Sequence, residues 1–88
     1  MTVTLKNGAL TARIESKGAE LLSLVKNETE YMWQKDPAFW GKTSPVLFPI
    51  VGNLRNDTVT FDGKPYTMAK HGLCRAAEFT IENVSDTD

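Results

Sequence analysis

Two dipeptides, Asn7-Gly8 and Asp62-Gly63, each stand between short runs in which apolar and polar residues alternate. Asn-Gly and Asp-Gly favour the positive φ angles that two-residue hairpin turns require. The arms that they join are residues 3–5 and 10–14 for the first turn, and 59–61 and 66–68 for the second. A chain with such turns is predicted to fold as consecutive antiparallel hairpins.

Two further runs are predicted strands. Over residues 21–25 periodicity alone does not separate strand from helix, but the short length and the flanking turn residues favour strand. Phe79 and Ile81 alternate with polar residues and predict another strand. No segment has a sustained helical period, so the predicted fold class is all-β, an antiparallel sandwich or barrel.

The middle of the chain differs from its ends. It carries five of the eight aromatic residues and three of the four prolines, within residues 30–57. Proline lacks the N–H that a central strand needs, so the segment is predicted to be irregular. It can form core plugs or the walls of a sugar site, and Trp33 and Trp40 are interpreted as core residues.

Composition excludes several function classes. The 88 residues are 41% hydrophobic and 24% charged, which is typical of one small globular domain. The net charge is −1 and the basic residues are scattered, so neither nucleic acid nor a membrane is an expected partner. The lack of a signal peptide and the single cysteine make a cytoplasmic location the default expectation.

No strand is predicted after residues 79–81, and residues 85–88 are predicted to form only a turn. An unpaired hairpin arm leaves backbone groups open to other chains. The chain is therefore interpreted as the first part of something longer. On its own it is expected to self-associate through exposed strand edges.

The stretch "AKHGLCR", residues 69–75, holds the only histidine and the only cysteine. Histidine is the side chain best suited to acid/base work near neutral pH, so His71 is the candidate catalytic residue. Gly72 allows close approach of a ligand or another backbone, and Arg75 is suited to sugar hydroxyls or an anion. The alternative is a polar connection in which His71 caps a strand.

Other chemistry is not favoured. Cys74 has no second cysteine and only one histidine nearby, so it is interpreted as a small buried hydrophobe, and no metal site is predicted. Gly52-Asn53 lacks the spacing of a phosphate loop. The carboxylates are placed mostly on solvated faces, and no pair receives acid and base roles: Glu15, Glu20, Glu28, Glu30, Glu78 and Glu82.

Three stretches of the sequence, taken in their order along the chain, resemble those of a known protein family. They are "KGAELLSLV", "EYMWQKDPAFWGKTSPVLFPIVGNL" and "FDGKPYTMAKHGLCR". This succession resembles the N-terminal part of the aldose 1-epimerase (galactose mutarotase-like) family, most of all its bacterial galactose mutarotase-related branch. The resemblance covers roughly residues 8–82, and "SPVLFPIVG" followed by "HGLCR" carries most of it.

The resemblance implies a large antiparallel β-sandwich, with residues 1–88 as the N-terminal portion of a single domain. It implies an isomerase that interconverts the α and β anomers of an aldose such as galactose or glucose by acid/base catalysis, with no metal or organic cofactor. His71 matches the earlier of the family's two active-site histidines, and Arg75 matches the arginine of the same loop. The family's main acid and base lie downstream, so the 88-residue piece alone is predicted to be inactive.

Two positions depart from the family pattern. Asn53 stands where many members have an arginine, and it is the third predicted site residue, for substrate binding. Lys42 and Thr43 stand where the sugar-phosphate branch tends to have an arginine. Both departures favour a neutral sugar. The alternatives are a non-catalytic sugar-binding or sugar-sensing domain, and a structural β domain.

Overall fold

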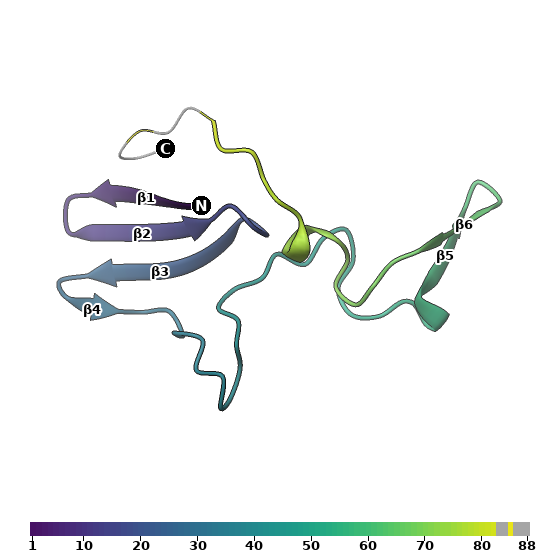
Figure 1. Cartoon of the computed structure of the whole chain (residues 1–88), viewed down its shortest axis with the longest axis horizontal. Coiled ribbons are helices and arrows are strands. Elements are labelled where there is room, and N and C mark those ends of the chain that lie inside the picture. The colour runs from purple at the N-terminus through teal and green to yellow at the C-terminus, as the bar shows by residue number, and fades with distance from the viewer. Residues whose placement is uncertain (83–84, 86–88) are drawn as a thin grey trace.

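The computed structural model describes residues 1–82 and 85. Residues 2–30 form a four-stranded antiparallel sheet in which each strand pairs with its neighbours in sequence (Figure 1). The strands are β1 Thr2–Asn7, β2 Leu10–Glu15, β3 Glu20–Lys26 and β4 Thr29–Glu30. The predicted strand at residues 21–25 is therefore confirmed as part of β3.

A separate antiparallel hairpin, of β5 (Thr58–Phe61) and β6 (Lys64–Thr67), projects away from this sheet (Figure 1). Two short 3-10 turns complete the described elements, η1 at Arg55–Asp57 and η2 at Cys74–Ala76. The all-β antiparallel prediction is confirmed. No helix among the described residues is long and apolar enough to cross a membrane.

The turn of the second hairpin lies where it was predicted. Asp62 and Gly63 have φ angles of 49° and 75°, and positive φ at both positions is typical of a type I′ turn. The first hairpin turns one residue later than predicted. Asn7 pairs with Leu10, so the loop is Gly8 and the residue after it, and glycine takes the first loop position with φ 56°. Positive φ at that position alone fits a type II′ turn.

The strand predicted at residues 79–81 is wrong. The backbone contacts at this point are an isolated antiparallel bridge between Lys17 and Glu78 and a hydrogen bond of 2.9 Å from Phe79 N–H to the carbonyl of Ser16. The residues do alternate, but no described strand lies beside them to complete a ladder. The turn predicted at residues 85–88 lies, except for Ser85, outside the described residues.

The described residues do not enclose a hydrophobic core. None of their hydrophobic side chains is fully buried, and the radius of gyration is 16.3 Å. A compact chain of this length would have about 12 Å. Trp33 and Trp40 are 43% and 50% exposed, so their interpretation as core residues is wrong within this chain. Large apolar surfaces are therefore left uncovered.

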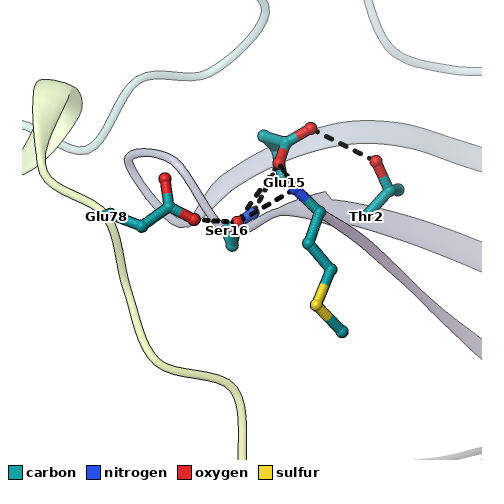
Figure 2. A network of polar contacts seen from close by, with 5 residues as sticks. Thr2, Glu15, Ser16 and Glu78 are labelled. Carbon is teal, nitrogen blue, oxygen red and sulfur yellow. Dashed lines mark hydrogen bonds and ion pairs between the residues drawn. The ribbon is translucent and has the colours of Figure 1, made fainter.

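A polar network ties the segment that follows η2 to the end of β2 (Figure 2). The N-terminal ammonium of Met1 donates to Glu15 Oε1 at 2.7 Å, and Thr2 Oγ1 donates to Glu15 Oε2 at 3.2 Å. The Ser16 N–H donates to Glu15 Oε1 at 3.0 Å, and the Ser16 hydroxyl donates to Glu78. Hydrogen bonds to Glu15 and Ser16 thus link the N-terminus to Glu78.

This network predicts an acid-sensitive contact. The hydrogen bond from the N-terminal ammonium lowers the pKa of Glu15 from its usual 4.5 to about 2. Because the folded-state pKa is depressed, the stabilisation is present above about pH 4.5 and is lost as the pH falls towards 2. We expect a carbon-detected NMR titration of Glu15 to have its midpoint near 2. A midpoint near 4.5 would show that the contact is not formed in solution.

Candidate functional site

The loop at residues 69–75, called the histidine loop from here on, is fastened to the middle segment of the chain. The N–H groups of Leu73 and Cys74 both donate to the carbonyl oxygen of Phe48, at 3.1 and 3.2 Å. Phe48 lies within "SPVLFPIVG", more than 20 residues earlier in the chain. The two motifs therefore form one structural unit.

His71 and Gly52 are joined by two hydrogen bonds. The His71 N–H donates to the Gly52 carbonyl at 2.8 Å, and the Gly52 N–H donates to His71 Nδ1, also at 2.8 Å. A backbone N–H can only donate, so Nδ1 is the unprotonated nitrogen and the neutral ring carries its hydrogen at Nε2. Among the described residues Nε2 has no hydrogen-bond partner. The ring is fixed at one nitrogen and free to donate at the other.

Gly72 permits the close contact between the two motifs. It is buried, has a φ of 78° and forms an isolated parallel bridge with Phe48. A Cβ at this position would meet the Phe48 carbonyl oxygen and would lie 2.6 Å from the Phe48 carbonyl carbon and 2.8 Å from Pro49 N. Only glycine meets both the conformational and the steric requirement.

A depression of about 420 Å³ lies beside the histidine loop, and its volume is in the range of small-molecule sites. We call it the histidine depression. Its lining comes from the middle segment of the chain and the histidine loop, and consists of Trp40, Lys42, Ser44, Pro45, Leu47, Lys70, His71 and Arg75. His71 and Arg75, two of the three predicted site residues, are thus brought together. Asn53 is exposed and is not part of this lining.

Glu20 holds the backbone at Ser44, one of the residues that line the depression. Its Oε1 accepts hydrogen bonds from the N–H groups of Thr43 and Ser44, at 2.7 and 3.1 Å. Glu20 is only 7% exposed, so its placement on a solvated face was wrong. Its partners lie 23 and 24 residues away, and no local pattern around "GAELL" indicates them.

We expect Glu20→Ala to destabilise the protein by about 2 kcal/mol or more, because it leaves the N–H groups of buried Thr43 and half-buried Ser44 without an acceptor. Glu20→Gln keeps an amide oxygen at the same place. Its loss in free energy of unfolding should be less than half of the loss in Glu20→Ala. Denaturant unfolding of both variants checks this. Equal losses, or a loss below about 0.5 kcal/mol for the alanine variant, would contradict the anchoring role.

Gly18 also helps to position Arg75, through contacts between the two backbones. The Gly18 N–H donates to the Ala77 carbonyl at 2.6 Å, and a Cβ at Gly18 would lie 2.6 Å from the Arg75 carbonyl oxygen. The backbone of η2 therefore lies directly on the β2–β3 connection. This contact places Arg75, itself half-buried, at the depression.

The side chains that could ligate a metal ion are dispersed. Within residues 1–82 and 85, no group of three or more His, Cys, Asp or Glu residues is arranged to hold a metal ion. Cys74 is free and half-buried, so it is more exposed than the buried hydrophobe predicted for it.

Comparison with known proteins decides the family. The family model described as aldose 1-epimerase matches residues 1–87. The chain belongs to the aldose 1-epimerase family. Protein LacX of Lactococcus lactis subsp. lactis, in chromosomal and plasmid forms, is 40% identical over 92 residues, which cover 98% of this chain and 31% of the relative.

Two solved structures of the family agree with the fold. A galactose mutarotase related enzyme from Lactobacillus acidophilus has a TM-score of 0.90 at 42% identity. A galactose mutarotase-like protein from Lactobacillus casei has a TM-score of 0.92 at 36% identity. Both matches cover 98% of this chain but only 29% and 30% of the solved chains. The prediction of an N-terminal portion of a galactose mutarotase-like fold is confirmed.

Proposed function

We propose that the complete product of the gene encoding these residues is an aldose 1-epimerase, an isomerase that interconverts the α and β anomers of an aldose. The observation that carries this proposal is the fixed His71 ring, held at Nδ1 by Gly52 and free at Nε2, in the lining of a depression of ligand size. We further propose that residues 1–88 are part of one sandwich domain, whose other strands cover the apolar surfaces left open here.

The reaction needs one group that gives a proton and one that takes a proton. A general acid protonates the ring oxygen of the sugar while a general base removes the proton from the anomeric hydroxyl. The ring opens to the aldehyde, the C1–C2 bond rotates, and closure gives either anomer. Nothing in this sequence of steps calls for a metal ion or an organic cofactor.

We assign His71 Nε2–H to the ring or anomeric oxygen, as a hydrogen-bond and proton donor. Arg75 is assigned to sugar hydroxyls or substituents, and this is supported by its place in the lining. The assignment of Asn53 to substrate binding rests on the resemblance alone, because Asn53 stands where many members of the family have an arginine. The exposed face of Trp40 suits the C–H face of a pyranose ring.

Residues 1–88 alone are expected to be inactive. The lining of the depression contains no carboxylate that could act as the base opposite His71. The second acid/base group must therefore come from other residues of the complete product. A cytoplasmic location and self-association of the isolated chain through exposed strand edges stay predictions.

Exchange NMR of the anomeric protons of glucose and galactose tests the function. The complete product is expected to accelerate exchange between the two anomers, whereas residues 1–88 expressed alone are not. Sugar binding with no acceleration would favour the alternative, a non-catalytic sugar-binding domain.

A further inference from the structure

We infer that Trp33 is a positioning residue of the sugar site. It holds the turn at residues 36–40, so that the half-exposed ring of Trp40 forms a fixed apolar wall of the histidine depression for the C–H face of a pyranose. This inference rests on the proposed function, because it takes the depression as the sugar site. It goes beyond that function by naming the residue that sets the position of the wall.

The first observation is a direct contact between the two tryptophans. Trp33 Nε1 donates a hydrogen bond to the carbonyl oxygen of Trp40 at 2.7 Å, across seven residues of the chain. An indole side chain has one donor and no acceptor, so this bond uses the whole hydrogen-bonding capacity of Trp33. The described lining of the depression contains Trp40 but not Trp33. The bond therefore links Trp33 to the site through the backbone of Trp40.

The second observation is the packing of the Trp33 ring. It meets the ring of Phe39 edge to face, with 6.1 Å between the ring centroids and 77° between the ring planes. Aromatic pairs prefer this arrangement and are stabilised by it. Phe39 directly precedes Trp40. Trp33 therefore holds two consecutive residues of the turn, one through its side chain and the other through its backbone.

The third observation is that Asp36 closes the turn between the two tryptophans. Its carbonyl oxygen accepts hydrogen bonds from the N–H groups of Phe39 and Trp40, at 3.0 and 2.9 Å. Its Oδ1 accepts another from the N–H of Ala38 at 3.0 Å, a local bond that aspartate side chains commonly form in turns. The turn thus has backbone and side-chain bonds of its own, and Trp33 adds the contacts from outside it.

The segment that carries Trp40 is also tied to the sheet on both sides of the turn. Before the turn, Gln34 Nε2 donates to the carbonyl of Leu22 at 3.1 Å. After it, Glu20 accepts the N–H of Thr43 at 2.7 Å. Leu22 and Glu20 both lie on β3. The backbone of Trp40 is therefore fixed relative to the sheet before a sugar binds, and a preorganised wall lowers the entropic cost of binding.

The surroundings of the Trp40 ring suit a sugar. The side chain is 50% exposed although it lines a concave site, and small-molecule sites are typically lined by aromatic and apolar side chains. A pyranose stacked on this ring would lie in the same depression as His71. Because the stacking is already made in the bound ground state, its loss should weaken binding and leave the chemical step unchanged.

The test uses the complete gene product with galactose and glucose as probes. Calorimetry gives the dissociation constant of each sugar, and exchange NMR gives kcat and KM. Trp33→Phe keeps an aromatic ring against Phe39 but removes the N–H. It should raise the dissociation constant and KM by about three- to tenfold at an unchanged kcat. Trp40→Leu removes the wall itself and should raise the dissociation constant by about tenfold or more.

A double-mutant cycle separates positioning from a merely structural role. In a chain that already carries Trp40→Leu, Trp33→Phe should change the dissociation constant by less than about twofold, because the ring that Trp33 positions is gone. Tyr66→Phe is the matched control, since it also removes one donor from an aromatic side chain. Tyr66 lies on β6 outside the lining, so both KM and kcat should stay unchanged.

Two results would overturn the inference. One is a Trp33→Phe variant that binds both sugars as tightly as the wild type. The other is an equal loss of affinity from Trp33→Phe with and without the Trp40 ring, because Trp33 would then act by another route.

The two proposals fail separately. Acceleration of anomer exchange with a KM that neither Trp33→Phe nor Trp40→Leu changes would overturn the positioning role and leave the epimerase proposal standing. Sugar binding that both substitutions weaken, without acceleration of any exchange, would support the positioning role and overturn the epimerase proposal.

Discussion

His71→Asn should lower the anomer exchange rate of the complete gene product by about 100-fold or more, with little change in its melting temperature. Asparagine is tolerated at positive φ, and His71 has a φ of 64°. Its side-chain oxygen can also accept the hydrogen bond from Gly52 N–H that Nδ1 accepts now. The substitution thus keeps the structural bond but removes the proton-transferring nitrogen, and general acid–base catalysis contributes about 10²–10⁴ in rate.

His71→Ala is the companion variant, since it removes the ring and its bond to Gly52 together. It should lose both activity and stability, whereas the asparagine variant should lose only activity. Exchange within about twofold of the wild-type rate in His71→Asn would show that the histidine is a structural loop residue.

Gly72→Ala should destabilise the protein by more than about 3 kcal/mol. An alanine here would adopt the left-handed conformation, which costs roughly 1–2 kcal/mol. Its Cβ would also be forced against the backbone of Phe48 and Pro49, and overpacking typically adds about 1–3 kcal/mol. Denaturant unfolding of the complete product measures the loss.

Gly63→Ala provides the control for this variant. Gly63 has a similar φ, 75°, but nothing lies within 4 Å of the Cβ that alanine would add. It should therefore cost only the conformational part, about 1–2 kcal/mol. If the two variants lose equal stability, the two motifs are not in contact as described.

Local patterns predicted most of the strands. The two glycine-containing turns and the alternation around them placed β1, β2, β5 and β6, because hairpins depend on residues close together in sequence. At residues 79–81 a local pattern did not produce a strand. An alternating pattern states which face a strand would bury, but a strand forms only where a partner lies beside it, and the sequence of one segment does not specify that partner.

The candidate site was predicted in part. His71 and Arg75 were found because they stand close together in a short loop with a glycine, and the structure places both at one depression. Lys42, Lys70 and Trp40 were not assigned to it, and Glu20 was placed in solvent. These roles depend on contacts across more than 20 residues, such as Glu20 with Thr43, which no local pattern indicates.

A crystal structure of the complete gene product with a bound aldose or its 6-phosphate tests the central claim most directly. We expect the sugar to lie in the histidine depression, with His71 Nε2 within about 2.6–3.2 Å of the ring or anomeric oxygen and Nδ1 still bonded to Gly52. A sugar bound elsewhere, or a His71 ring whose Nε2 is bonded to protein atoms in the complete fold, would contradict it.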